Sequence, residues 1–198
     1  MAFTILQTGV FSSERSKETT FGGVADVQST LRPAGSIIAF RGKVGTTDTV
    51  YKVSILLENP PDGSVIDLTP KFTANGSGTD PDSSSGLPVP VITYTDSNQR
   101  LSSVPWTLNF LGPTTNNIVN PGDRVELQVW LLNRDTSVAQ SANNSVSYMS
   151  AGDGGFTSSN TLLTPNDKFT IELKFDRGAV LYFQRTLPSK LDDVMSLK

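Results

Sequence analysis

The 198-residue chain contains no cysteine and no histidine. Without cysteine it can have no disulfide framework, no thiolate-ligated metal site and no cysteine nucleophile. Without histidine it can have no Ser-His-Asp triad and no metal site built on imidazole. The lack of cysteine fits both a reducing interior and an exposed protein that avoids oxidation. These two absences remove much of the familiar enzyme chemistry, so we expect no catalytic residues, no cofactor and no metal.

Excess positive charge and long hydrophobic runs are also missing. Lys and Arg number 16 against 19 Asp and Glu, which gives a net charge of -3 and no overall field that would attract a polyanion. No local basic stripe occurs either, so we expect no nucleic-acid partner. The longest apolar runs, such as 37–40 and 55–57, have the length of a strand and are far shorter than the roughly 20 residues of a membrane span. The first residues lack the basic and apolar regions of a secretory signal.

Residues 1–33 differ from the rest of the chain. Their apolar positions recur at intervals of three, four or seven, and no proline interrupts them before Pro33. This spacing predicts an amphipathic helix that ends at Pro33, although Gly9 and the Gly22-Gly23 pair each cost about 1 kcal/mol relative to alanine. We therefore divide the chain into a helical region over 1–33 and a second domain over 34–198.

Beyond residue 35 the apolar period changes to two, which predicts strands. Asn120-Pro121-Gly122-Asp123 has the sequence of a type II turn, Asp176-Arg177-Gly178 is predicted to be a three-residue hairpin loop, and Pro88 and Pro90 suggest that 89–95 is an edge strand. About eight strands without a second helical pattern predict a mainly β protein, an antiparallel Ig-like β-sandwich or barrel. The predicted strands cover 36–44, 49–58, 65–74, 89–95, 104–111, 124–132, 169–175 and 179–186.

Two long polar segments interrupt these strands, at 75–87 and 135–160. Because they have too little apolar area to offset the entropy of ordering, we expect surface loops with room for short strands. Each contains a sequon, Asn75-Gly76-Ser77 and Asn143-Asn144-Ser145, so Asn75 and Asn143 are candidate N-glycosylation sites if the protein is exported.

Other candidate sites have simpler interpretations. Asp80 and Asp82 could ligate calcium, but the spacing of a calcium-binding loop is absent and a solvated turn is favoured. Trp106, Trp130 and Tyr148 could form a sugar-binding platform, but packing in a core or an interface is favoured. No Gly-x-Ser-x-Gly motif is present to present a nucleophilic serine.

Three stretches, together about a third of the chain, carry a family resemblance. Residues 6–19, which include Thr8-Gly9-Val10-Phe11 before a polar turn, resemble the stretch that follows the hydrophobic helix of archaeal flagellins, the archaellins. Asn120-Pro121-Gly122-Asp123 resembles the turn before an archaellin strand. The C-terminus resembles that of archaellins in Gly178-Ala179-x-Leu181, Arg185-Thr186-x-Pro188 and Leu191-Asp192-x-Val194-Met195-x-Leu197.

The resemblance implies a fold and a function. Archaellins have a class III signal peptide and a long N-terminal helix that bundles in the filament core, while a β-sandwich head forms the outer wall. The chain would then be an extracellular, structural subunit of the archaellum filament, assembling helically for swimming motility and surface adhesion. Its partners would be other copies of itself, other archaellin paralogues and glycans. Because Phe3-Thr4-Ile5-Leu6 resembles the last turn of the hydrophobic helix, the resemblance also implies a truncated chain, with 1–33 as the remnant of that helix and membrane contact only through the missing part.

Apolar residues at chain ends with no obvious core are either docked or interfacial. On this argument we predict subunit contacts from both ends of the chain. The candidates are Phe3, Leu6, Val10, Phe11, Leu191, Val194, Met195 and Leu197.

Two other functions remain open. An accessory or stator protein of the archaellum, with an Ig-like head that anchors the motor to the surface layer, should lack the Arg185-Thr186-x-Pro188 tail. A secreted carbohydrate-binding or adhesin β-sandwich would need an aromatic platform and often a calcium site. An enzyme is a distant third alternative.

Overall fold

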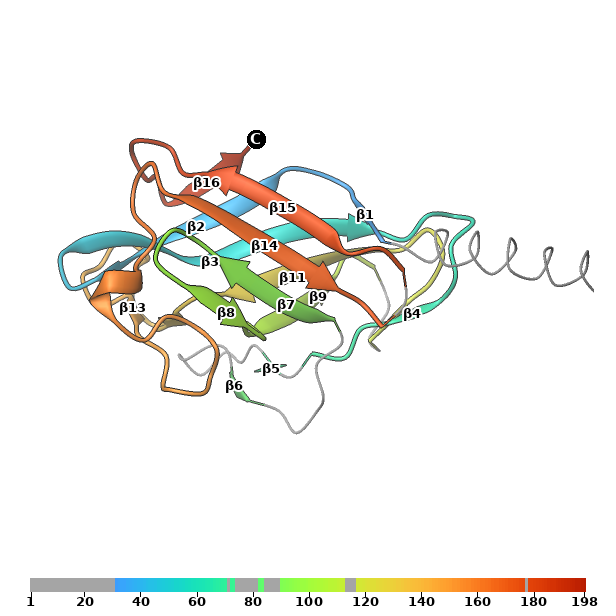
Figure 1. The fold of residues 1–198 in the computed structure, drawn as a ribbon, viewed down its shortest axis with the longest axis horizontal. Helices are drawn as coiled ribbons and strands as arrows, with labels where there is room; N and C mark the ends of the chain where they lie inside the picture. The colour runs from blue at the N-terminus through green and yellow to red at the C-terminus, as the bar shows by residue number, and fades with distance from the viewer. Residues whose placement is uncertain (1–30, 71, 74–81, 84–89, 113–116, 177) are drawn as a thin grey trace, which may run out of the picture.

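The computed structural model describes residues 31–70, 72–73, 82–83, 90–112, 117–176 and 178–198, which form two stacked antiparallel sheets (Figure 1). The larger sheet has the order β16-β2-β3-β11-β9, with β1 paired to β3. Its strands are β1 (Arg32–Pro33), β2 (Ile37–Val44), β3 (Thr47–Glu58), β9 (Trp106–Phe110), β11 (Arg124–Trp130) and β16 (Val194–Leu197).

The smaller sheet has the order β15-β14-β7-β8 and faces the larger one. It consists of β7 (Val91–Thr95), β8 (Arg100–Ser102), β14 (Lys168–Lys174) and β15 (Leu181–Thr186). Three short ladders lie outside the two sheets: β4 (Ile66–Asp67) with β10 (Ile118–Val119), β5 (Phe72–Thr73) with β6 (Asp82–Ser83), and β12 (Asn133–Arg134) with β13 (Val146–Ser147). A 3-10 turn spans Ser159–Thr161. The predicted antiparallel β-sandwich is confirmed.

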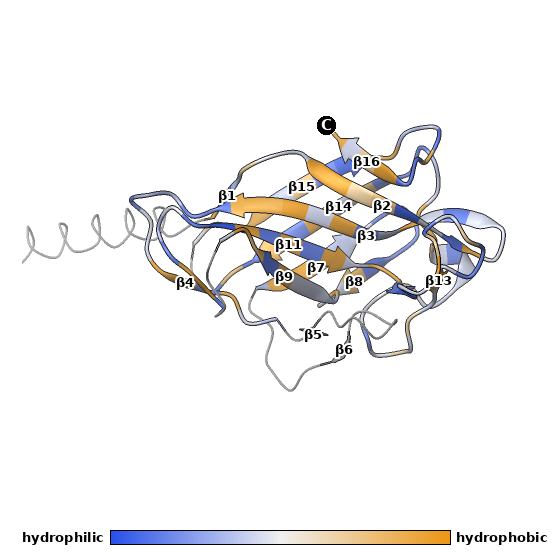
Figure 2. Cartoon of the chain, turned by 180° about the vertical axis from the view of Figure 1, so that it is seen from behind, coloured by the Kyte–Doolittle hydropathy of each residue, from blue (hydrophilic) through white to orange (hydrophobic). Residues whose placement is uncertain are grey.

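The core lies between the two sheets because alternate residues of each strand point inward. In β11 every second residue is fully buried, namely Val125, Leu127 and Val129. From the other sheet, Tyr94 stacks on Phe169 with ring centroids 6.1 Å apart. Figure 2, in which the larger sheet faces the viewer, shows mostly apolar residues along β2 and more polar residues along β11.

Most predicted strands are present, with two corrections. The single strand predicted over 65–74 is wrong: the chain forms only the two-residue pieces β4 and β5, with Pro70 between them, where it cannot donate a ladder hydrogen bond. The edge position predicted for 89–95 is also wrong, because β7 pairs with both β14 and β8. Pro90 lies just before β7 and therefore removes no hydrogen bond from either ladder.

The turn predictions have mixed outcomes. Gly122 has a φ of +85° and the Asp123 N–H donates to the Asn120 carbonyl at 3.0 Å, as the predicted type II turn requires. Gly178 has a φ of +94°, in the region that favours glycine, but β14 ends at Lys174 and β15 begins at Leu181. The hairpin connection is therefore longer than the three residues predicted.

The polar segment 135–160 is only partly a surface loop. Val146, Met149 and Phe156 are buried, and the Phe156 ring meets Tyr94 edge-on at 5.3 Å between centroids. The Phe156 N–H donates to the Leu131 carbonyl at 2.7 Å, which attaches the segment to the end of β11. These three apolar residues, spaced through a polar sequence, pack much of the segment against the core.

Two regional predictions remain, the helix over 1–33 and the surface loop over 75–87, and the structure describes only a few residues of each. Residues 1–30 lie outside the described residues; at the end of the predicted helix, Leu31 is buried and Arg32–Pro33 form β1, so the sheet domain begins before residue 34. Of 75–87, only Asp82–Ser83 are described. Among the residues that the structure describes, no helix is long and apolar enough to cross a membrane.

Candidate functional site

Among the described residues, no three Asp, Glu, His or Cys side chains gather in a way that could hold a metal ion. Asp80 lies outside the described residues, and Asp82 belongs to β6. Trp106 and Trp130 are 1% and 4% exposed, so the predicted packing role holds for both and neither can form a sugar platform. Tyr148 packs, partly buried, against the core.

The C-terminal tail, residues 187–197, is docked on the chain's own sheet. Strand β16 pairs antiparallel with β2, so that Met195 lies opposite Ala39 and Leu197 opposite Ile37. Leu191, Met195 and Leu197 are buried in the core of the chain itself, and their role as subunit contacts stays a prediction. Val194 points the other way because side chains alternate along a strand, and it is 54% exposed. The other predicted contacts, Phe3, Leu6, Val10 and Phe11, lie outside the described residues.

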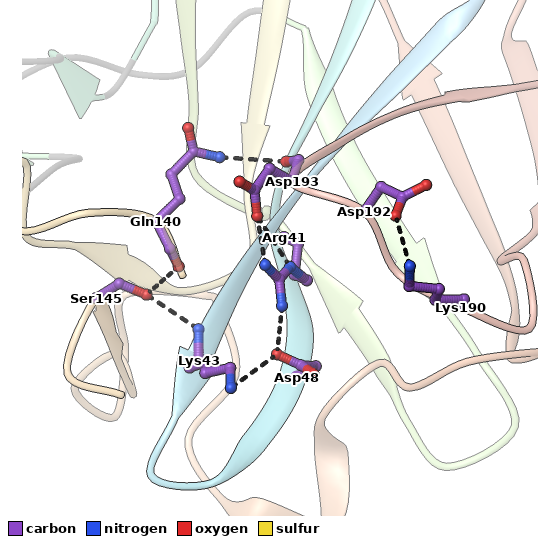
Figure 3. A network of polar contacts seen from close by, with 8 residues as sticks. All are labelled: Arg41, Lys43, Asp48, Gln140, Ser145, Lys190, Asp192 and Asp193. Atoms are coloured by element: carbon purple, nitrogen blue, oxygen red, sulfur yellow. Dashed lines mark hydrogen bonds and ion pairs between the residues drawn. The ribbon is translucent and has the colours of Figure 1, made fainter. Parts of the chain in front are cut away.

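A polar network holds the tail to β2 (Figure 3). Arg41 follows an irregularity in the β2–β3 register and has only 16% of its side chain exposed. It donates to Asp48 at 2.9 Å through Nη1 and to Asp193 through Nε at 3.2 Å and through Nη2. The hydrogen bonds that Arg41 donates, most of all those to Asp193, raise its pKa, although partial burial alone would lower it. The Arg41 N–H also donates to the Asp193 carbonyl at 3.0 Å, so backbone and side chain anchor the tail together.

The 135–145 loop reaches the same place. Gln140 donates through Nε2 to the Asp193 carbonyl at 3.2 Å, and the Lys43 N–H donates to Ser145 Oγ at 3.0 Å. Arg134, buried at the base of the loop, donates through Nη1 to the Ser145 carbonyl at 3.2 Å. The loop, the β2–β3 hairpin and the tail therefore form one interlocked corner (Figure 3). Of the predicted glycan acceptors, Asn143 is exposed on this loop, and Asn75 lies outside the described residues.

Two charged residues of the larger sheet, Lys52 and Glu126, have contacts with neighbouring strands. Lys52 Nζ lies 4.4 Å from the ring centroid of Phe40 and 4.9 Å from that of Trp130, within cation–π range of both. On the neighbouring strand, partial burial alone would raise the pKa of Glu126, but hydrogen bonds from Ser54 and Asn109 outweigh it and lower that pKa. The Lys52 ammonium therefore contacts aromatic rings and the Glu126 carboxylate accepts hydrogen bonds.

The exposed apolar residues lie mostly elsewhere. Three of them, which we call the hairpin patch, are Val91, Val180 and Tyr182 at one end of the smaller sheet. Val91 pairs with Lys174 and Tyr182 with Glu172, so the patch straddles the end of β14. The sequence prediction missed this patch, although the alternation Leu181-Tyr182-Phe183 carried the signal: with Phe183 buried, Tyr182 has to face outward. Among the residues that the structure describes, the other large exposed apolar side chains are Val65, Leu111, Ile118 and Val194.

Comparisons with known proteins agree with the resemblance found in the sequence. No protein-family model matches the chain. A curated protein named "Probable flagellin 1", from Archaeoglobus fulgidus, is 23% identical over 201 residues, covering 99% of this chain and 84% of the relative.

Two solved structures share the fold. The archaeal flagellum of Methanospirillum hungatei matches with a TM-score of 0.54 and 20% identity, over 99% of this chain and 87% of that chain. The crystal structure of archaeal flagellin FlaB1 from Methanocaldococcus jannaschii matches with a TM-score of 0.51 and 12% identity, over 84% of this chain and 95% of that one. The predicted resemblance to archaellins is confirmed, and the fold is the one that these flagellins have.

Proposed function

We propose that the chain is a structural subunit of the archaeal flagellum, the archaellum, and that copies of it assemble helically into the filament at the cell surface. The observation that carries this proposal is the extent of the likeness: a probable flagellin aligns with 99% of the chain, and a flagellar filament structure covers the same share of the fold. A likeness over the whole length argues for a shared role better than a shared sandwich alone would.

The role is mechanical rather than catalytic. A rotating filament transmits torque through contacts between rigid heads, and the interlocked corner around Arg41 stiffens the head by joining three segments distant in sequence. The two predicted alternatives have less support. The Arg185-Thr186-x-Pro188 tail that an accessory protein should lack is present, leading into the docked β16. Burial of Trp106 and Trp130 removes the aromatic platform that a carbohydrate-binding sandwich would need.

Contacts between copies would use residues that remain exposed in the folded head. Of the predicted tail contacts only Val194 is exposed, and the hairpin patch adds Val91, Val180 and Tyr182. A second copy of the chain is the partner that a helical filament places against such surfaces. Contacts through Phe3, Leu6, Val10 and Phe11, association with archaellin paralogues, and glycans on Asn75 and Asn143 belong to the same proposal.

The test is deletion of the gene in its own host. We expect loss of surface filaments in negative-stain micrographs and loss of swimming, both restored by the wild-type gene on a plasmid. Mass spectrometry of sheared filaments from wild-type cells should identify this chain as a component. Filaments that lack the chain, together with unchanged swimming of the deletion strain, would contradict the proposal.

A further inference from the structure

The second sequon, Asn143-Asn144-Ser145, has its two functional side chains in opposite environments. Asn143 and Asn144 are exposed, whereas Ser145 has no exposed surface. The Ser145 N–H donates to the Ala142 carbonyl at 3.0 Å, which closes a tight turn with the two asparagines at its corners. The acceptor amide therefore faces solvent while the hydroxyl of the same motif faces the protein.

Every polar group of Ser145 is already paired. Its hydroxyl donates to the Gln140 carbonyl at 2.8 Å and accepts from the Lys43 N–H at 3.0 Å. Its carbonyl accepts from the Asp135 N–H at 3.0 Å and from Arg134 Nη1 at 3.2 Å. Buried and fully hydrogen-bonded, this serine holds the loop on β2, and an enzyme can reach its hydroxyl only by breaking these bonds.

The loop also lies tightly on the strand beneath it. A Cβ added at Gly42 of β2 would lie 2.6 Å from Val146 Cγ1 and 3.3 Å from Ser145 Oγ. The glycine at this position thus permits the close approach of residues 145–146, and no space remains between loop and strand for another group.

An oligosaccharyltransferase selects Asn-x-Ser or Asn-x-Thr, so it has to recognise the hydroxyl as well as the amide. We propose that Asn143 accepts an oligosaccharide from a lipid-diphosphate donor only before residues 135–145 dock onto β2, so that folding closes the sequon. In the transfer the Asn143 amide nitrogen bonds to the anomeric carbon of the donor sugar. The bond from that carbon to the diphosphate oxygen breaks, the diphosphate leaves with the electron pair, and the amide releases one proton. The exposed Asn143 side chain then carries the glycan outside the folded head.

This inference rests on the proposed function only in that an exported chain meets such a transferase. The assay uses the folded full chain, a single-subunit oligosaccharyltransferase and a lipid-diphosphate-linked oligosaccharide, with a synthetic peptide of residues 138–150 as the open sequon. Glycopeptide mass spectrometry measures the rate at Asn143, and Asn143→Gln is the acceptor-null control. Because transfer requires local opening, we expect the folded chain to be modified roughly tenfold or more slowly than the peptide.

Two variants open the loop without altering the sequon. Arg134→Ala removes the side-chain hydrogen bond to the Ser145 carbonyl, and Gly42→Ala places a methyl group against Val146. Each should speed transfer to the folded chain, provided that its circular dichroism stays native and the 138–146 amides exchange faster. If both variants unfold, the comparison of wild type with peptide decides alone.

Equal rates for folded wild type and peptide would overturn the proposal, and so would a peptide that is not modified at all. Folded variants with an opened loop that are modified as slowly as wild type would overturn it too. The assay does not involve filaments, so its failure is distinguishable from failure of the proposed function.

Discussion

The C-terminal tail and the hairpin patch differ in how much of their apolar surface the fold buries. The tail is an apolar chain end without an evident core, yet Leu191, Met195 and Leu197 are buried and β16 completes the larger sheet. The patch belongs to the clearest predicted hairpin, yet Tyr182 is 59% exposed and Val180 is 53% exposed. The face on which a strand places an apolar residue therefore decides its exposure more than its distance from a chain end does.

The largest expected effect tests the buried side of this comparison. Leu191→Ala and Met195→Ala each remove buried apolar volume, so we expect each to lower the free energy of unfolding by about 2–4 kcal/mol. Val194→Ala, on the exposed face of the same tail, is the matched control and should stay within about 0.5 kcal/mol. Urea unfolding followed by tryptophan fluorescence measures all three. Equal and small effects would mean that the tail does not dock.

The next effect concerns the attachment of the tail. Arg41→Ala leaves Asp193 and Asp48 without their shared partner, and we expect a loss of about 1–2 kcal/mol, a figure kept low because both carboxylates are partly solvated. The control is Lys190→Ala, which breaks the exposed Lys190–Asp192 pair at 3.7 Å and should cost almost nothing. A loss in Lys190→Ala as large as that in Arg41→Ala would show that the network adds nothing beyond surface charge.

A smaller effect depends on pH. The pKa of Glu126 is lower in the folded chain than the ordinary 4.5, so its contribution to stability is present above that value and is lost as the pH falls through the folded pKa. We expect wild type to lose stability between about pH 5 and pH 3, and Glu126→Gln to lose less over that interval. Thermal unfolding across the pH series measures these slopes, and identical slopes for wild type and Glu126→Gln would contradict the assignment.

The smallest effect on stability belongs to the patch. Tyr182→Ser and Val180→Ser should each change the free energy of unfolding by no more than about 0.5 kcal/mol, because these side chains are more than half exposed. When the variants replace the native gene in the host, we expect shorter or fewer filaments. Filaments of normal length and number, formed by a Tyr182→Ser and Val180→Ser double variant, would remove the patch from the proposed contacts.

Sequence reasoning succeeded where the local pattern is decisive. The alternation in β11 identified its inward face, and Pro121-Gly122 identified a turn whose backbone requires glycine. It failed where tertiary contacts decide. Burial of Phe156 depends on Tyr94, some 60 residues away along the chain, and β16 becomes a strand only because the edge of β2 is open to it.

The candidate site, too, is only partly predictable from the sequence. The sequon was visible in the sequence, but burial of Ser145 depends on Lys43 and Gly42, which only the fold brings to it. Tyr182 could have been predicted as exposed from the register of its hairpin. The polar cluster that joins Arg41 to Asp193 links residues 152 positions apart and carries no local signal.

The most direct test of the account is a helical reconstruction, by electron cryomicroscopy, of filaments isolated from the native host. We predict that the described sandwich fits the outer wall, that β16 pairs with β2 of the same copy, and that Val180 and Tyr182 contact a neighbouring copy. Filaments in which Tyr182 faces solvent and β16 pairs with β2 of a neighbour would contradict the assignment of tail and patch, and filaments without this chain would contradict the proposed function itself.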